Sequence, residues 1–173
     1  MCEFYNKQYE KTHNLDYRSL MPTNLFGYGD NYDLNDSHVI PALIRKIHEA
    51  KIKNKKNVSI WGTGNPKREF LHVDDLANAC FFIMKFLNSN DIYDKNVSHI
   101  NIGSGEEISI KVLAELIKKI IKYEGELTFD ISKPDGMPRK LLDSSRLNVL
   151  KWNPKIKLRE GIKQVYKSYQ ENI

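Results

Sequence analysis

Segments with helical spacing alternate with short strand-like segments along this chain, and that alternation constrains the fold more than any other feature. The clearest helix is SIKVLAELIKKIIKY (109–123), whose apolar residues recur at helical spacing, and the strand-like ELTFDI follows at 126–131. Alternation of this kind predicts an α/β fold. Helices are expected at 1–13, 39–50, 73–88, 109–123, 144–151 and 158–170, and strands at 17–21, 57–62, within 99–105, and at 126–131. Few strands are predicted for an independent doubly wound sheet.

Polar residues mark the starts of several predicted helices. Ser37 and Ser109 are expected as N-caps, and Asp74 or Asp75 is expected to accept backbone N–H bonds where the helix 73–88 begins. The helix at 1–13 has no capping residue before it. We therefore expect it to be the tail of a longer helix.

The charge pattern argues against nucleic acid as a partner. The formal charge is +5, and its densest cluster, Lys51, Lys53, Lys55 and Lys56, lies away from the aromatic residues. Proteins that bind polyanions usually concentrate charge on one face, so a solvated loop is favoured here.

Cysteine usage and hydropathy point to a cytoplasmic protein without a membrane segment. Cys2 and Cys80 have no C-x-x-C partner, so no zinc site or disulfide framework is predicted, and Cys80 is expected to be a buried thiol. No apolar run approaches the ~18 residues that a membrane helix needs. The N-terminus lacks the apolar core of a signal peptide.

The stretch GNPKREFLHVDD (64–75) gathers the residues most suggestive of chemistry. His72, Asp74 and Asp75 resemble metal ligands, but a strand would turn Asp75 away from the other two, so no metal is predicted. Arg68 follows a glycine-rich turn and precedes a strand, where its planar side chain would suit a phosphate. The alternative for Arg68 is an ion pair with Glu69 or Asp74.

Three other residues have both a structural and a functional interpretation. Trp61 ends a strand and could stack on a base or sugar, although a core position is favoured. His38 stands where a polar loop meets a helix, and a lone His is more often structural than catalytic. Asp135, in KPDGMPRK, could present a carboxylate to hydroxyl groups or simply belong to a turn. The GSGEE at 103–107 is interpreted as a turn because it is not G-x-G-x-x-G.

Five segments, in order and spacing, resemble the C-terminal part of the GDP-L-fucose synthases, which are extended short-chain dehydrogenase/reductases. These segments are MPTNLFGYGDNYD, NDSHVIPALIRKIHEA, WGTGNPKREFLHVDDLA, HINIGSGEEISI and KPDGMPRKLLD. The resemblance implies NADP(H)-dependent conversion of GDP-4-keto-6-deoxy-D-mannose to GDP-L-fucose, by epimerisation at C3 and C5 and reduction at C4. It also implies a homodimer for the full-length enzyme.

The resemblance assigns roles to individual positions. His38 matches the family's acid/base His and also lies against the nicotinamide end of the cofactor. The segment Pro22, Thr23, Asn24 and Leu25 matches residues that line the cofactor. Trp61, Arg68 and Asp135 match positions that contact the GDP-sugar, and Lys46 stands where the family usually has Arg. A Lys can meet a phosphate as a point charge but cannot form the bidentate fork.

Several family motifs are absent from the sequence. These are the G-x-x-G-x-x-G loop, the catalytic Cys with its neighbouring Ser, and the Y-x-x-x-K pair. The resemblance therefore implies the end of a Rossmann-type NADP-binding domain at 1–27 and a mainly substrate-binding domain at 28–173, with segments near 69–105 returning to the Rossmann sheet.

This chain alone is expected to be unable to perform the reduction. One alternative is a non-catalytic GDP-sugar-binding module, or a subunit that completes a separate N-terminal chain. Another is a different nucleotide-sugar epimerase or dehydratase of the same superfamily.

Overall fold

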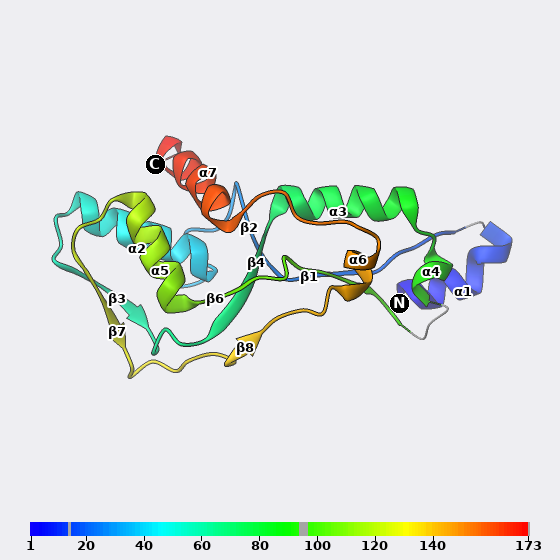
Figure 1. Ribbon diagram of the computed structural model, residues 1–173, viewed down its shortest axis with the longest axis horizontal. Coiled ribbons are helices and arrows are strands. Elements are labelled where there is room, and N and C mark those ends of the chain that lie inside the picture. Colours follow the sequence, from blue (N-terminus) through cyan, green and yellow to red (C-terminus); the bar gives the residue numbers. More distant parts are fainter. Residues whose placement is uncertain (14, 94–96, 173) are drawn as a thin grey trace.

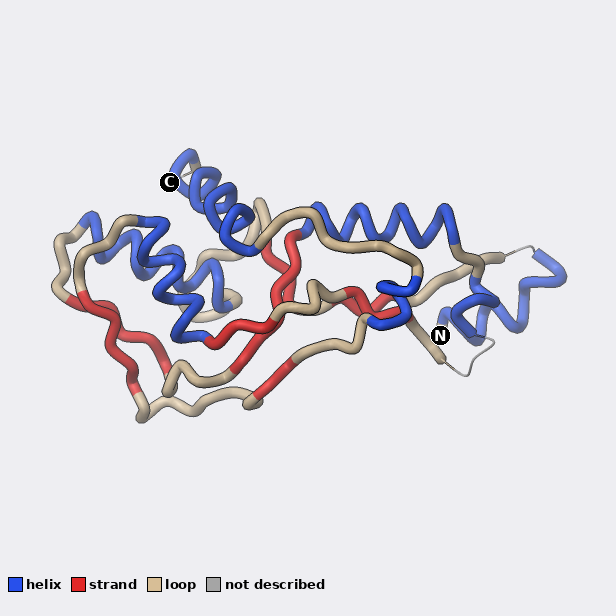
Figure 2. Tube along the Cα trace, viewed as in Figure 1, coloured by secondary structure: helices blue, strands red, loops and turns tan. Residues whose placement is uncertain are grey.

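The computed structural model describes residues 1–13, 15–93 and 97–172. The molecule is elongated, with α1 at one end and the β3–β7 pair at the other (Figure 1). Short strands run along its length between helices (Figure 2). The helices are α1 (Cys2–His13), α2 (Val39–Ile52), α3 (Val73–Phe86), α4 (Ser89–Tyr93), α5 (Ile110–Ile121), α6 (Ser145–Val149) and α7 (Leu158–Glu171). The strands are β1 (Leu20–Pro22), β2 (Asn24–Phe26), β3 (Asn57–Trp61), β4 (Lys67–His72), β5 (Ile100–Ile102), β6 (Glu107–Ser109), β7 (Glu126–Asp130) and β8 (Arg139–Lys140).

In the part of the chain that the structure describes, the strands form three small sheets. β1 pairs with β5 and β3 pairs with β7, both in parallel. In the third sheet β4 is central: β2 and β8 run parallel to it, and β6 runs antiparallel. The predicted α/β class is confirmed, whereas β2, β6 and β8 were not predicted because two or three residues are too short to show a period.

Two apolar cores lie on either side of β4. Phe70 packs into a core that α2, α5 and α7 share with β3, whereas its neighbour Leu71 packs into a core formed by α3, α4, α6 and β5. Successive side chains on a strand point to opposite faces, so one strand serves both cores. This places β4, and the motif that it carries, at the centre of the molecule.

The start and end of α5 follow from local chemistry. The Ser109 hydroxyl accepts a hydrogen bond from the Val112 N–H at 3.3 Å, as expected for an N-cap. Leu113, Ala114, Ile117 and Ile121 form its buried stripe. Lys122 then takes a left-handed conformation (φ 57°) and ends the helix.

The Ser37 cap predicted for α2 was wrong, whereas at α3 Asp74 and Asp75 lie in the first turn, as expected, but neither is the cap. His38 has an extended backbone (ψ 165°), so α2 begins one residue later than a Ser37 cap would require. At α3 the cap is His72, whose Nδ1 accepts from the Asp74 N–H at 3.2 Å. Asp75 lies in the first turn but accepts from Lys155 N and Ile156 N, both at 2.9 Å, because burial turns it toward the chain that leads into α7.

Two further findings concern the described residues. None of their helices is both long and apolar enough to cross a bilayer. Cys80 is half-buried on α3, so the expected full burial of this thiol was wrong: its position lies at the margin of the helix's buried face.

Candidate functional site

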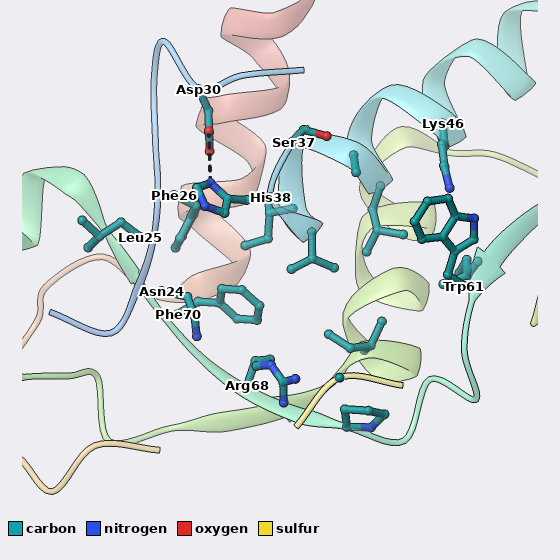
Figure 3. A pocket seen from close by; sticks show the side chains of 18 of the residues that line it. Asn24, Leu25, Phe26, Asp30, Ser37, His38, Lys46, Trp61, Arg68 and Phe70 are labelled. Carbon is teal, nitrogen blue, oxygen red and sulfur yellow. Dashed lines mark ion pairs between the residues drawn. The ribbon is translucent and has the colours of Figure 1, made fainter. Parts of the chain in front are cut away.

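A cavity of about 790 Å³ lies between β2, α2, the end of β3, β4 and the loop after β7. This is within the usual size range of small-molecule sites. Eight of the nine predicted site residues line it: Thr23, Asn24, Leu25, His38, Lys46, Trp61, Arg68 and Asp135. Pro22, in β1, does not. Figure 3 shows His38 and Trp61 on opposite sides of the cavity, with Arg68 on β4 between them.

Two cations face this cavity without a carboxylate partner among the described residues. Arg68 Nη1 donates to the Lys67 carbonyl at 2.8 Å, and the predicted alternative of an ion pair with Glu69 or Asp74 was wrong. Glu69 lies on the opposite face of β4, and Asp74 lies beside His72. Lys46 is half-buried on α2, and this burial lowers the pKa of its ammonium group. Two such cations in one cavity suit a polyanionic ligand.

Trp61 is an exposed aromatic platform, so the favoured core position was wrong. It is 61% exposed because the alternating pattern of β3 buries Val58 and Ile60 and turns Trp61 outward. Lys46 Nζ lies 5.1 Å from the ring centroid, and Lys133 Nζ lies 5.7 Å from it. Both are within cation–π range. The exposed ring and its two cations offer stacking and negative-charge recognition together.

His38 extends from the start of α2 at the other side of the cavity. Its side chain is 84% exposed, and Nδ1 lies 3.9 Å from Asp30 Oδ1. The dashed line in Figure 3 marks this pair. An accessible imidazole beside a carboxylate can accept a proton and return it.

Asp135 lines the cavity, but both of its oxygens are already engaged. Oδ1 accepts from the Thr63 N–H at 2.8 Å, and Oδ2 accepts from the Thr63 hydroxyl at 2.6 Å. Gly62 (φ +77°) lies directly against it, since a Cβ there would be 2.2 Å from Oδ1. Asp135 therefore fastens its own loop to the turn after β3.

Thr23 links β1 to β2, whose first residue is Asn24, at the carboxyl end of the β1–β5 pair. The Thr23 hydroxyl and the Asn24 amide both donate to the Glu69 carbonyl, at 3.3 and 2.7 Å. In open α/β sheets, ligands bind outside the carboxyl ends of the strands. This polar edge near an exposed imidazole fits one end of a dinucleotide. The glycine-rich motif that would hold a pyrophosphate is absent from the sequence.

Sequence reasoning missed several polar residues of the cavity, among them Asp30 and Ser37. Asp30 approaches His38, and the Ser37 hydroxyl is buried without a hydrogen-bond partner in the described part of the chain. Both lie in the polar stretch 28–37, which was interpreted only as a loop and a cap. The sequence could have indicated them, because Asp30 and Ser37 stand close to His38 in the same polar loop.

The residues that line this cavity belong to a chain with recognisable relatives. The profile of the NAD dependent epimerase/dehydratase family matches residues 1–103. The chain belongs to this family.

Among curated proteins, the whole chain aligns with GDP-L-fucose synthases. It is 51% identical over 173 residues to the "Probable GDP-L-fucose synthase 1" of Oryza sativa subsp. japonica, covering 100% of this chain and 49% of that protein. It is 47% identical over 176 residues to the GDP-L-fucose synthase of Escherichia coli (strain K12), covering 99% and 53%. These matches confirm the resemblance, and the chain spans about half the length of these relatives.

Solved structures agree with this placement. A GDP-6-OMe-4-keto-L-xylo-heptose reductase from C. jejuni superposes with a TM-score of 0.89 at 36% identity, covering 100% of this chain and 58% of that one. A GDP-L-fucose synthetase from Naegleria fowleri, bound to NADP, gives 0.85 at 28% identity, covering 99% and 52%. The extended short-chain dehydrogenase/reductase fold class is thereby confirmed.

Proposed function

We propose that this cavity is the GDP-sugar side of a GDP-L-fucose synthase site, where GDP-4-keto-6-deoxy-D-mannose is epimerised at C3 and C5 and reduced at C4. One observation carries the proposal: Lys46 and Arg68 face a single cavity beside the exposed Trp61 ring, and neither cation has a carboxylate partner in the described chain. A nucleoside diphosphate has the matching features, an aromatic base and two phosphates.

In this proposal each substrate-binding residue contacts a different part of the GDP-sugar. Arg68 grips the diphosphate with its planar fork, and Lys46 adds a point charge whose position is set by packing on Trp61. Trp61 offers a face for stacking. Asp135 acts by holding its loop in place, because its two oxygens already bind Thr63.

His38 is the proposed acid/base residue of the epimerisation. A proton on a carbon next to a carbonyl is acidic enough for a positioned base to remove and a positioned acid to return. The exposed imidazole holds that proton on a ring nitrogen, and its Nδ1 lies 3.9 Å from Asp30 Oδ1. NADP(H), when bound, supplies the hydride for reduction at C4. Thr23, Asn24, Leu25 and His38 would line its nicotinamide end, with Pro22 supporting them from β1.

We also propose a division of the chain into two domains. Residues 1–27 would belong to the dinucleotide-binding domain and 28–173 mainly to the substrate domain, with segments near 69–105 returning to the dinucleotide side. The two apolar cores support this division in outline: α3 and β5, within 69–105, share a core with Leu20 and Leu25 of the first segment, and Leu147 and Trp152 join the same core. From the family resemblance we extend the proposal to a homodimer in the cytoplasm, which sedimentation and cell fractionation would test.

A second candidate function is favoured by one surface. On α3 the side chains of Phe81 and Met84 are 68 and 59% exposed, although the opposite face of the helix, which carries Ala79 and Ile83, is buried. Exposed apolar surface of this kind marks a protein interface. It fits a GDP-sugar-binding subunit that completes a separate chain carrying the glycine-rich loop, the Cys and Y-x-x-x-K. Co-purification of such a chain would favour this candidate.

Calorimetric titration of this chain with GDP and with UDP tests the proposed substrate class. We expect GDP to bind at least about tenfold more tightly than UDP, a difference that one or two base contacts can supply. Equal binding of UDP would favour another nucleotide-sugar epimerase or dehydratase. Absence of binding to either nucleotide would contradict the proposal.

A further inference from the structure

Glu69 is a fully buried carboxylate for which the proposed function has no use. It lies on β4 between Arg68 and Phe70 and is 0% exposed. No ion pair joins it to a cation in the described chain. A buried carboxylate is costly unless hydrogen bonds compensate its lost hydration. Hydrogen bonds from the surrounding segments must therefore compensate for the burial of Glu69.

Glu69 accepts four hydrogen bonds from segments far apart in sequence. Oε1 accepts from the Gly105 N–H at 2.7 Å, and Oε2 accepts from the Leu142 N–H at 3.1 Å. Its main-chain carbonyl accepts from Thr23 and Asn24, as described above. One residue therefore joins the β1–β2 link, the turn after β5 and the segment after β8.

The segment that Leu142 ends carries part of the cavity wall. We call residues 131–142 the strap. Asp135 fastens it to Thr63, β8 pairs it with β4, and Glu69 holds its last residue. Residues 131–141 are all exposed, so little apolar packing holds the strap in place. Segments of this kind depend on polar contacts for their order.

The strap also touches the proposed phosphate-binding residue. A Cβ on Gly136 would lie 3.1 Å from Arg68 Nη2, which means that the backbone of the strap already approaches the guanidinium. A shift of the strap would therefore change the space available to Arg68.

The surroundings of the Glu69 carboxylate are built closely around it. A Cβ on Gly103 would lie 2.4 Å from Oε1 and 2.8 Å from the Ser144 hydroxyl oxygen, so only glycine fits there. Both carboxylate oxygens face backbone N–H donors. A glutamine in this place would set its own NH₂ group against one of these donors.

We propose that Glu69 is a positioning residue, which holds the strap and the Thr23–Asn24 segment in a fixed relation so that Arg68 faces the ligand site and the strap forms its wall. The ligand in question, a GDP-sugar, rests on the proposed function. The positioning itself rests on the four hydrogen bonds.

The test compares Glu69→Gln with two controls in the full 173-residue chain. Glu107→Gln breaks the surface ion pairs that Glu107 makes with Lys67 and with Arg139 of the strap. Ile83→Val weakens the other core without touching the strap. Amide hydrogen exchange reports local order, and calorimetry with GDP reports binding.

For Glu69→Gln we expect faster exchange at 131–142 and at Gly105, unchanged exchange in α5, and GDP binding weaker by about tenfold. Ile83→Val should leave strap exchange and GDP affinity unchanged, and Glu107→Gln should change GDP affinity less than twofold, about 0.4 kcal/mol. If Glu69→Gln does not fold, Glu69→Asp, which keeps the charge but shortens its reach, carries the same expectation.

Two results would overturn the positioning role: unchanged exchange at Gly105 and the strap, or faster exchange spread evenly through α5 as well. If the unmodified chain does not bind GDP, the proposed function fails, and the exchange measurements still decide the role of Glu69.

Discussion

Arg68 and Glu69 are neighbours in sequence with opposite surroundings. Alternation along β4 sends Arg68 to the cavity and Glu69 into the interior, where backbone N–H groups meet it. A local ion pair between them is therefore impossible, although their adjacency suggested one. At the scale of the residue, strand geometry excluded the salt bridge and left the Arg68 side chain facing the cavity.

Replacement of Arg68 by Lys should separate charge from geometry. Arg68→Lys keeps the charge but loses the bidentate fork, so we expect GDP binding about tenfold weaker. Titration with guanosine, which has no phosphate, is the control and should show no change. An equal loss for guanosine and GDP would mean that Arg68 shapes the cavity without binding phosphate.

His48 is expected to make stability depend on pH. Burial lowers the pKa of this imidazole from its ordinary value of 6.5, and its Nδ1 lies 3.0 Å from the Tyr166 hydroxyl. The unfolded chain then binds more protons than the folded chain, so the free energy of unfolding falls as the pH drops below about 6.5.

Urea unfolding at pH 7.5 and pH 5 checks this dependence. His48→Gln can keep a hydrogen bond to Tyr166 and does not titrate, so its free energy of unfolding should fall less between the two pH values. An equal fall in both proteins would assign the pH dependence to other groups.

At the scale of the element, helices follow the sequence more closely than strands do. The buried stripe and the Ser109 cap of α5 are visible in the periodicity and in one residue type. β8 has only two residues, and its pairing with β4 depends on a partner some seventy residues away. A pattern in the local sequence cannot report such a contact.

Loss of the Ser109 cap should destabilise the protein measurably. Ser109→Ala leaves the Val112 N–H without its acceptor, and we expect the free energy of unfolding to fall by about 1 kcal/mol. Ser109→Asp retains an acceptor and should restore most of this loss. Urea unfolding of the three proteins measures both effects, and equal stability of all three would rule out the cap as a contributor.

At the scale of the whole molecule, the chain unites a cavity suited to a nucleotide with an incomplete set of family motifs. Lys46, Arg68 and Trp61 line the cavity, whereas Y-x-x-x-K and the glycine-rich loop are not in the sequence. Nucleotide binding and reduction can therefore be tested separately in this polypeptide.

We predict that the 173-residue polypeptide alone binds GDP but does not oxidise NADPH. With the 4-keto sugar and NADPH present, absorbance at the cofactor's near-ultraviolet band should not decline above a protein-free control. Reduction needs a proton donor for the developing alkoxide, and the family's donor pair is absent. Steady cofactor consumption would contradict this prediction.

The sequence by itself determined the α/β class and the main helices, because periodicity is a local property, and its resemblance to the GDP-L-fucose synthases pointed to eight of the residues that line the cavity. Tertiary structure alone decided whether each side chain is exposed, buried or engaged in hydrogen bonds. Trp61 is exposed because β3 has an outer face, Asp135 is engaged because Thr63 lies opposite it, and Glu69 is buried because three distant segments meet at β4. Each outcome depends on contacts between residues far apart in the chain, which no local pattern encodes.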